Sequence, residues 1–518
     1  MIIFVTNMRN LFLSLMSGLL LAFSWPSIGI FPFIFFAFIP LLVLEERAGK
    51  GKTVFGYAYL SFLVFNLITT YWVWYATAVG SVFAFLVNSL LMAFAFYIFH
   101  KIKEVTKPRL GYLAFIVCWL SFEYLHLNWD LSWPWLTLGN VFANIPSIVQ
   151  WYEYTGVLGG SLWVLLINIL VYRTWTVEGT KQKWILPVLV IIAPVLFSFY
   201  LGSAKELLIT DTQEIVIVQP NVDPYTDKFS IGYEEQLSDF IALAKTKLTQ
   251  STVLLVGPET ALQERIWENK LEVTYSVRAF RELQKEFPDL SILVGASTYK
   301  MFGHGEQKTA TARQIRNEHV FYDAYNSAIF IPDSGKVQVY HKTKLVPGAE
   351  KTPFPKLLDK LAGLMLDLGG TSGSLGTENK VHQFKVNEMN VQPLICYESI
   401  YGDLQKGNTN LIAIITNDGW WKNTAGYKQH FAYARLRAIE QRKMIVRSAN
   451  TGISGVINAN GEVLECTNWD EVICIVTDVQ LNNETTFYSK FGDYIGRLSV
   501  FLAFMLMITS FVKGRLKK

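Results

Sequence analysis

Long apolar segments near both ends of the chain constrain its fold more than any other feature of the sequence. They lie in residues 1–202 and 494–512, whereas the stretch between them has the mixed charge and the Gly and Pro content of a globular domain. A helix needs about 20 mainly apolar residues to cross the hydrocarbon core of a bilayer. Eight segments approach that length: 11–25, 28–44, 54–74, 82–99, 110–125, 158–175, 184–201 and 494–512.

The distribution of Lys and Arg gives these segments an orientation, because short loops rich in these residues stay in the cytoplasm. With the N-terminus inside, the inner segments hold fifteen Lys and Arg, and the short outer segments 76–81 and 128–157 hold none. The sequence therefore predicts cytoplasmic termini and an extracytoplasmic globular stretch. The net charge of +4 does not indicate a nucleic-acid partner, because the basic residues gather at the inner membrane face.

Three regions follow from this topology. We expect a transmembrane bundle of about seven spans in 1–203, an extracytoplasmic domain in 204–490, and a final span with a basic cytoplasmic tail in 491–518. The first apolar segment could also be a cleaved signal peptide. However, Trp25 and Pro26 stand where a small residue would be expected at the cleavage site, so we interpret the segment as a span.

Short β-branched runs alternate with amphipathic segments in the globular stretch, which is typical of layered α/β architecture. The predicted strands are 214–220, 252–260, 291–297, 391–399, 411–418, 444–450, 453–461 and 472–479, with a hairpin at 325–342. The predicted helices are 234–247, 277–286 and 430–443. Cys466 and Cys474 flank a short hairpin-like stretch and could be bridged or could be two strand thiols.

Three predicted strands end in residues of chemically reactive types: Glu259, Lys342 and Cys396. Each has an ordinary alternative, since such a Glu can cap a helix, a Lys can protect a sheet edge, and a Cys can be a small buried hydrophobe. Together they suit one chemistry. A thiol attacks well only as a thiolate, so it needs a base such as Glu259 and a nearby cation such as Lys342.

The motifs around these residues resemble a known superfamily. Gly257-Pro258-Glu259, the stretch Lys342–Pro347 with Glu350 beyond it, and Ile395-Cys396-Tyr397-Glu398 are similar to the Glu-Lys-Cys signature of the nitrilase, or carbon–nitrogen hydrolase, superfamily. The whole chain resembles its membrane-bound family, the apolipoprotein N-acyltransferases. That similarity includes Trp119 with Glu123, Trp133-Pro134-Trp135, and the stretch 416–420. The resemblance implies a membrane α-helical bundle of about eight spans with an extracytoplasmic α/β domain, an αββα sandwich.

The resemblance also implies roles for individual residues. Cys396 would carry an acyl chain as a thioester, Glu259 would deprotonate Cys396 and later the acceptor amine, and Lys342 would hold the oxyanion. Glu350 would support Lys342. The other candidates are Tyr397 and Glu398 beside the nucleophile, and Phe229, Asn326 and Trp420 as substrate-binding residues, with Phe229 standing where the family has Trp.

The partners implied by the resemblance are lipids. The acyl donor would be a phospholipid, phosphatidylethanolamine above all, and the acceptor the α-amino group of a diacylglyceryl-cysteine at a lipoprotein N-terminus. We expect no metal and no cofactor, a monomer, and a multi-pass protein of the bacterial inner membrane with its catalytic domain in the periplasm. The apolar stretch 354–375 could be a lid that dips toward the membrane or an ordinary buried helix.

Three other functions are compatible with parts of the sequence. A membrane-anchored amidase or other nitrilase-like hydrolase would pass the same thioester to water. A transporter with an outer binding domain is disfavoured, because transport paths generally need ionisable groups inside the spans and Glu123 is the main one present. A Cys-His enzyme could use His341, His382 or His430, although none has a recognisable cysteine-protease context.

Overall fold

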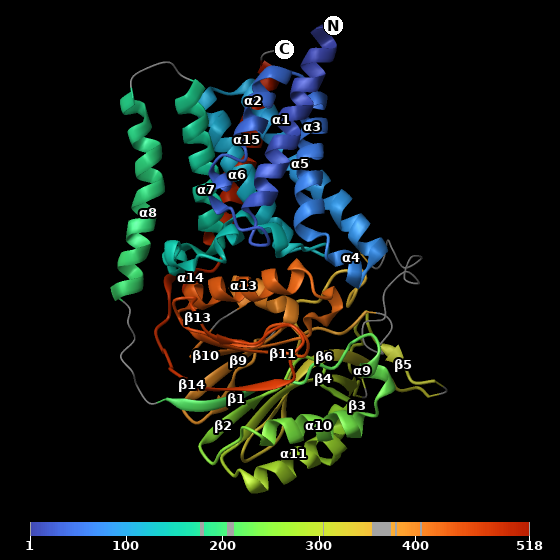
Figure 1. The fold of residues 1–518 in the computed structure, drawn as a ribbon. Coiled ribbons are helices and arrows are strands. Elements are labelled where there is room, and N and C mark those ends of the chain that lie inside the picture. The colour runs from blue at the N-terminus through green and yellow to red at the C-terminus, as the bar shows by residue number, and fades with distance from the viewer. Residues whose placement is uncertain are drawn as a thin grey trace. The chain divides into compact units, whose positions relative to one another are not determined.

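The computed structural model describes residues 2–176, 181–204, 212–303, 305–316, 318–354, 374–378, 381–404 and 407–516. The chain forms two compact units, one of Met1–Glu206 with Thr486–Lys518 and one of Leu207–Thr485 (Figure 1). Most of the apolar stretch 354–375 lies outside the described residues, so its two interpretations stay predictions.

The first unit is helical, and six of its described helical segments are long and apolar enough to cross a membrane. This confirms the prediction of a multi-pass membrane protein. The six are α3 (Gly51–Thr70), α5 (Ala78–Val105), α6 (Pro108–Leu127), α7 (Tyr152–Thr176), the segment Lys181–Ser203, which includes all but the last residue of α8 (Ile185–Ala204), and α15 (Tyr494–Leu516). The unit also contains α1 (Ile2–Ser24), α2 (Ile39–Ala48), α4 (Val73–Ala76), α14 (Phe487–Phe491), η1 (Phe31–Phe35), η2 (Pro134–Leu136), η3 (Leu138–Phe142), η4 (Pro146–Ile148) and η5 (Lys181–Trp184).

The segment 28–44 differs from the continuous span expected from its composition. It is divided between η1 and α2, each with a proline in its first turn, where the missing N–H costs no helical hydrogen bond. Asn168 of α7 satisfies the backbone at this break. Its Nδ2 donates to the carbonyl of Ile34 at 2.8 Å, and its Oδ1 accepts from the N–H of Phe38 at 2.9 Å. Pairing of this kind is required where a chain is irregular at membrane depth.

The second unit contains two β-sheets. Strands of the first run in the order β14 (Ile473–Val479), β1 (Gln213–Gln219), β2 (Thr252–Val256), β4 (Ser291–Met301), β6 (Phe321–Ile331), β5 (Arg313–Gln314), with β3 (Leu262–Trp267) on β4 and β7 (Gln338–His341) on β6. The second has β13 (Val463–Cys466), β12 (Gly455–Ile457), β11 (Met444–Ala449), β10 (Leu411–Thr416), β9 (Met389–Ile395) and β8 (Phe384–Val386). Every predicted strand is present, whereas the short β3, β5, β8 and β13 were not expected.

Cys466 and Cys474 belong to different sheets and are free thiols.

Alternating side chains make the two sheets the middle of a four-layer sandwich (Figure 1). In β1, Ile215 and Ile217 face the other sheet, while Val216 and Val218 face the helices, because successive strand residues point to opposite faces. The outer layers are α10 (Tyr233–Lys245) and α11 (Tyr275–Glu286) on the first sheet and α13 (Ala425–Gln441) on the second. The αββα prediction is confirmed. In the described part of this unit, the remaining short helices are α9 (Asp227–Ser230), η6 (Glu268–Val273), η8 (Cys396–Ile400), η9 (Gly402–Leu404) and η10 (Asp418–Trp421).

A break between β2 and β3 shapes the edge where Glu259 lies. Both strands run parallel to β4, β2 along its first half and β3 along its second, and the chain between them bulges away from the ladder. Gly295 of β4 faces this bulge. A Cβ there would lie 2.5 Å from the nitrogen of Thr260 and 2.6 Å from both Cα of Glu259 and the carbonyl oxygen of Pro258. Only a glycine allows this close approach of two backbones.

We predict that Gly295→Ala destabilises the globular unit by about 1–3 kcal/mol, the usual cost of forcing a methyl group into a filled site. The measurement is the melting temperature of the full chain in detergent. Gly303→Ala is the matched control, since a Cβ there would meet nothing nearer than Glu306 Oε2 at 3.5 Å. Equal melting temperatures for the two variants would contradict the packing described.

Candidate functional site

Three of the predicted residues lie at the ends of strands inside the globular unit. Glu259 occupies the bulge after β2, Lys342 follows β7 directly, and Cys396 follows β9 directly. The first two strands belong to one sheet and β9 to the other. All three side chains are buried, with exposed fractions of 6% for Glu259, 1% for Lys342 and 8% for Cys396.

Lys342 lies between two carboxylates. Its Nζ is 3.1 Å from Oε1 of Glu259 and 2.8 Å from Oε1 of Glu350. The Asn326 amide donates to the same two oxygens, at 2.7 Å for Glu259 and 2.9 Å for Glu350. Burial alone would lower the pKa of Lys342, but the two carboxylates outweigh it and raise that pKa well above its usual range. The side chain is therefore a permanent buried ammonium.

The Cys396 thiol is electrostatically coupled to this cluster. Burial raises its pKa well above the usual range and the negative charge of Glu259 adds to the rise, while Lys342 and the Thr416 hydroxyl oppose it. The thiol is therefore protonated at rest. The backbone of Cys396 has a φ of +51°, a strained region for a residue other than glycine. Such strain persists only where the surroundings fix the conformation.

Glu398 fixes the strand ends that carry Lys342 and Cys396. Its Oε2 accepts from the N–H of Ile395 at 2.8 Å. Its Oε1 accepts from the Tyr340 hydroxyl at 2.7 Å and from the N–H and hydroxyl of Thr343 at 2.6 and 2.7 Å. Burial raises the pKa of Glu398 above its usual value, and these donors offset only part of that rise. One buried carboxylate thus joins the residues that flank both functional side chains.

A buried network lies behind the nucleophile. Nε2 of His430 is 3.1 Å from the Cys396 carbonyl oxygen and 2.8 Å from Oγ of Ser399, and its Nδ1 is 2.9 Å from Asp418 Oδ1. Arg447 donates to the other oxygen of Asp418 at 2.7 Å. Burial alone would raise the pKa of Asp418, but its interactions with Arg447 and His430 outweigh burial and lower that pKa to about 2. The network holds the strained backbone of Cys396 from the side of α13.

The remaining candidates lie around this centre. Tyr397 is buried beside Cys396, with its ring 5.4 Å from that of Tyr401. Trp420 follows β10, and its ring lies 5.5 Å from that of Tyr225. Phe229 is in α9, with its side chain outside the described part. The His341 ring stacks on the Tyr325 ring with 3.8 Å between the ring centroids, and its Nε2 lies 2.6 Å from Oε1 of Glu268. His341 therefore pairs with a carboxylate other than Glu259 or Glu350.

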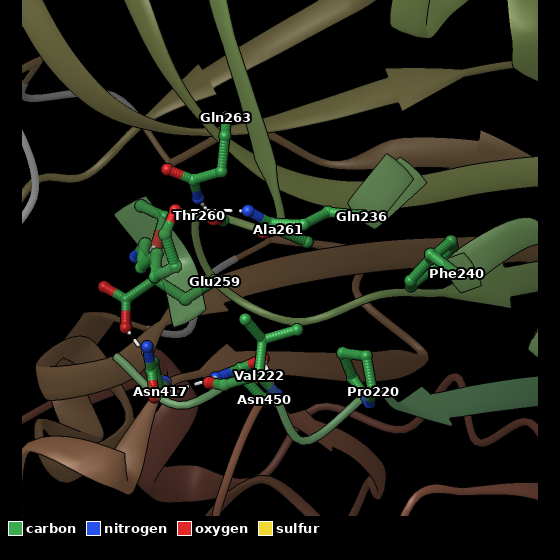
Figure 2. Close-up of a pocket in the computed structure, with 11 residues that line it drawn as sticks. Pro220, Val222, Gln236, Phe240, Glu259, Thr260, Ala261, Gln263, Asn417 and Asn450 are labelled. Carbon is green, nitrogen blue, oxygen red and sulfur yellow. Dashed lines mark hydrogen bonds between the residues drawn. The ribbon is translucent and has the colours of Figure 1, made fainter. Parts of the chain in front are cut away.

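Sequence reasoning gave no site role to several residues that this site uses, although three of them lie in the stretch 416–420 that carries part of the resemblance. They are Thr343, Thr416, Asp418, Arg447 and Asn417, whose N–H donates to Glu259 Oε2 at 3.1 Å (Figure 2). The position of 416–420 directly after a buried strand was the available signal, because side chains at strand ends meet at one edge of a sheet. Within the described residues, no group of three or more His, Cys, Asp and Glu could hold a metal ion.

Comparisons with known proteins cover almost the whole chain. Residues 17–170 match the apolipoprotein N-acyltransferase N-terminal domain, and residues 235–487 match the carbon–nitrogen hydrolase domain. An apolipoprotein N-acyltransferase of Chlorobaculum tepidum is 31% identical over 98% of this chain and 97% of its own length. One of Thermotoga maritima is 27% identical over 98% of this chain and 94% of its own length.

We predict that Asp418→Asn costs about 3–5 kcal/mol of unfolding free energy, because it leaves the buried Arg447 charge without its partner. The full chain in detergent should melt at a clearly lower temperature. The exposed Asp333→Asn serves as the matched control. A variant of Asp418 that melts with the wild type would show that the network does not stabilise the fold.

Proposed function

This chain belongs to the apolipoprotein N-acyltransferase family and is an acyltransferase, and from that premise we propose that Cys396 carries the acyl group from a phospholipid to the α-amino group of a lipoprotein. The acceptor residue in this proposal is an N-terminal S-diacylglyceryl-cysteine, and the donor is a phospholipid such as phosphatidylethanolamine. We further propose a periplasmic catalytic unit, cytoplasmic termini and a monomeric enzyme.

The observation that carries the mechanism is the buried ammonium of Lys342, which contacts Glu259 and is electrostatically coupled to the Cys396 thiol. A protonated thiol is a poor nucleophile, so the reaction needs a base within the site. Glu259 is a buried carboxylate whose charge is coupled to that thiol. Glu350 keeps Lys342 in place, since it accepts from Lys342 and also from the N–H of Val346 at 2.8 Å.

In the first half-reaction, Glu259 takes the proton of Cys396 and the thiolate attacks the ester carbonyl carbon of the donor. A carbon–sulfur bond forms, and the negative charge that develops on the carbonyl oxygen is stabilised by Lys342 and by backbone N–H groups that follow Cys396. The ester carbon–oxygen bond then breaks. Glu259 returns its proton to the departing alkoxide, which leaves a lysophospholipid and a thioester on Cys396.

In the second half-reaction, the α-amino group of the acceptor attacks the thioester. Glu259 accepts a proton from that amine, the carbon–sulfur bond breaks, and an amide forms while Cys396 recovers its proton. Water would give a free fatty acid instead of an amide, which is the outcome expected of a hydrolase. Full-length similarity to the N-acyltransferases favours transfer to the amine.

We predict that Cys396→Ser abolishes the acyl adduct on the enzyme. Membranes containing the wild type, incubated with radiolabelled phosphatidylethanolamine, should yield a labelled protein band that hydroxylamine removes, because hydroxylamine cleaves thioesters. The exposed Cys466→Ser is the control and should label like the wild type. A hydroxylamine-sensitive adduct that persists in Cys396→Ser would overturn the assignment of the nucleophile.

We predict that Lys342→Met lowers kcat about 100-fold to 1,000-fold, as loss of an oxyanion-stabilising donor does in other enzymes, with little change in KM for the donor. Initial rates against phosphatidylethanolamine concentration separate the two constants, and the melting temperature checks that the variant folds. A large rise in KM with unchanged kcat would make Lys342 a binding residue for the donor instead.

A further inference from the structure

A pocket beside Glu259 contains groups that the mechanism does not use (Figure 2). It is a partly open hollow, and the empty space within it amounts to about 340 Å³ when the adjoining open solvent is included. Its walls come from α9, α10 and the start of β3, and from the segments that follow β1, β2, β10 and β11, so segments attached to both sheets line it. In Figure 2 the carboxylate of Glu259 points toward Asn417 at one end of this pocket. A molecule in the pocket would therefore lie next to the proposed base.

Lys228 of α9 places a buried cation in this pocket, in addition to Lys342, which lies on Glu259 outside the pocket lining. The residue is 6% exposed, and its Nζ donates to Oγ1 of Thr260 at 2.6 Å. Within the described part of the chain it has no carboxylate at ion-pair distance, although buried charges are usually paired. An ammonium has three hydrogens to donate, so two remain after the bond to Thr260. Its Nζ also lies 5.6 Å from the Trp420 ring centre, which favours the cation weakly.

Asn417 supplies another donor without a partner. The residue is 1% exposed, and its Oδ1 accepts from the N–H of Gly419 at 3.2 Å and from the amide of Asn450 at 3.3 Å. These two donors fix the orientation of the amide. Among the described residues, Nδ2 of Asn417 has no hydrogen-bond partner. A buried donor left unpaired costs roughly 1–3 kcal/mol, so an oxygen acceptor bound in the pocket would be stabilised by Asn417.

The positive charge of Lys228 favours an anionic ligand in the pocket. Burial lowers the pKa of Lys228 to about 8, although the charge of Glu259 raises it, and a bound anion would hold the ammonium protonated. Repulsion between such an anion and Glu259 ends when Glu259 accepts the Cys396 proton. In a glycerophospholipid, the phosphodiester is only a few bonds from the ester that reacts. A phosphate site next to the base Glu259 therefore matches the shape of the donor.

We propose that Lys228 and Asn417 bind the phosphodiester of the donor phospholipid while its ester reacts at Cys396. This proposal rests on the function proposed above, and it assigns the pocket to the first half-reaction. A peptide carbonyl of the acceptor is the other oxygen group that could occupy the pocket. If that carbonyl occupies the pocket, loss of Lys228 should slow the second half-reaction instead of the first.

The test measures the two half-reactions separately on the purified full chain in detergent. Acylation of Cys396 is followed by intact-protein mass spectrometry in a single turnover, with phosphatidylethanolamine or with the phosphate-free diacylglycerol of the same chains. Transfer is followed after addition of a diacylglyceryl-cysteine peptide. The variants are Lys228→Met, the charge-preserving Lys228→Arg, and the exposed control Lys247→Met, each checked by its melting temperature.

Lys228→Met should slow acylation by phosphatidylethanolamine about 10-fold to 100-fold, the range expected for losing a hydrogen bond to a charged group. Acylation by diacylglycerol and transfer to the peptide should change less than about twofold, and Lys228→Arg should recover most of the loss. If the wild type does not react with diacylglycerol, two other results support the proposal. Lys228→Arg should restore acylation by phosphatidylethanolamine, and Lys228→Met should leave transfer to the peptide unchanged.

Three results would overturn the proposal. Equal slowing with both donors would mean that Lys228 acts only through Glu259, and slowing of transfer alone would mean that the pocket binds the acceptor. No slowing of acylation by phosphatidylethanolamine would mean that it binds neither. An absent acyl-enzyme in the wild type would instead refute the proposed function, so the two failures are distinguishable.

Discussion

The buried ion pairs of Lys342 determine how the rest of the site can be built. An ammonium that is 1% exposed survives folding only if carboxylates surround it, and Glu259 and Glu350 meet that requirement at 3.1 and 2.8 Å. Burial and then the charge of Glu259 raise the pKa of the Cys396 thiol, so the thiolate is disfavoured at rest. The nucleophile is therefore a thiol at rest, and in the proposed reaction Glu259 takes its proton as the thiol attacks the donor.

The surrounding fold keeps this arrangement in place through backbone contacts. Gly295 lets the chain carrying Glu259 leave the ladder between β2 and β3. Glu398 joins the segments that flank Lys342 and Cys396, and His430 reaches the carbonyl of the strained Cys396 from the α13 side. These contacts link both sheets and one helix layer. A substitution at any of these contacts would shift Glu259, Lys342 or Cys396 indirectly, through the backbone.

The sequence was informative where the signal was local. Apolar strands that end in Glu259, Lys342 and Cys396 could be recognised because strand ends project their side chains from a rigid support. The division of 28–44 depended on Asn168, more than a hundred residues away, and could not be read from composition. Lys228 was missed for a similar reason. A lysine in a short helix after a strand is usually solvated, and only the folded chain encloses it beside Thr260.

Opposite effects of Glu259→Gln on two reactions of Cys396 test the account most directly. The charge of Glu259 raises the pKa of the Cys396 thiol, so its removal should increase the thiolate fraction and speed alkylation by iodoacetamide at neutral pH. The same variant has no base, so acylation by phosphatidylethanolamine should be lost. The measurement is both rates on one preparation. Faster alkylation with lost acylation is the predicted result, and acylation at the wild-type rate would contradict the account.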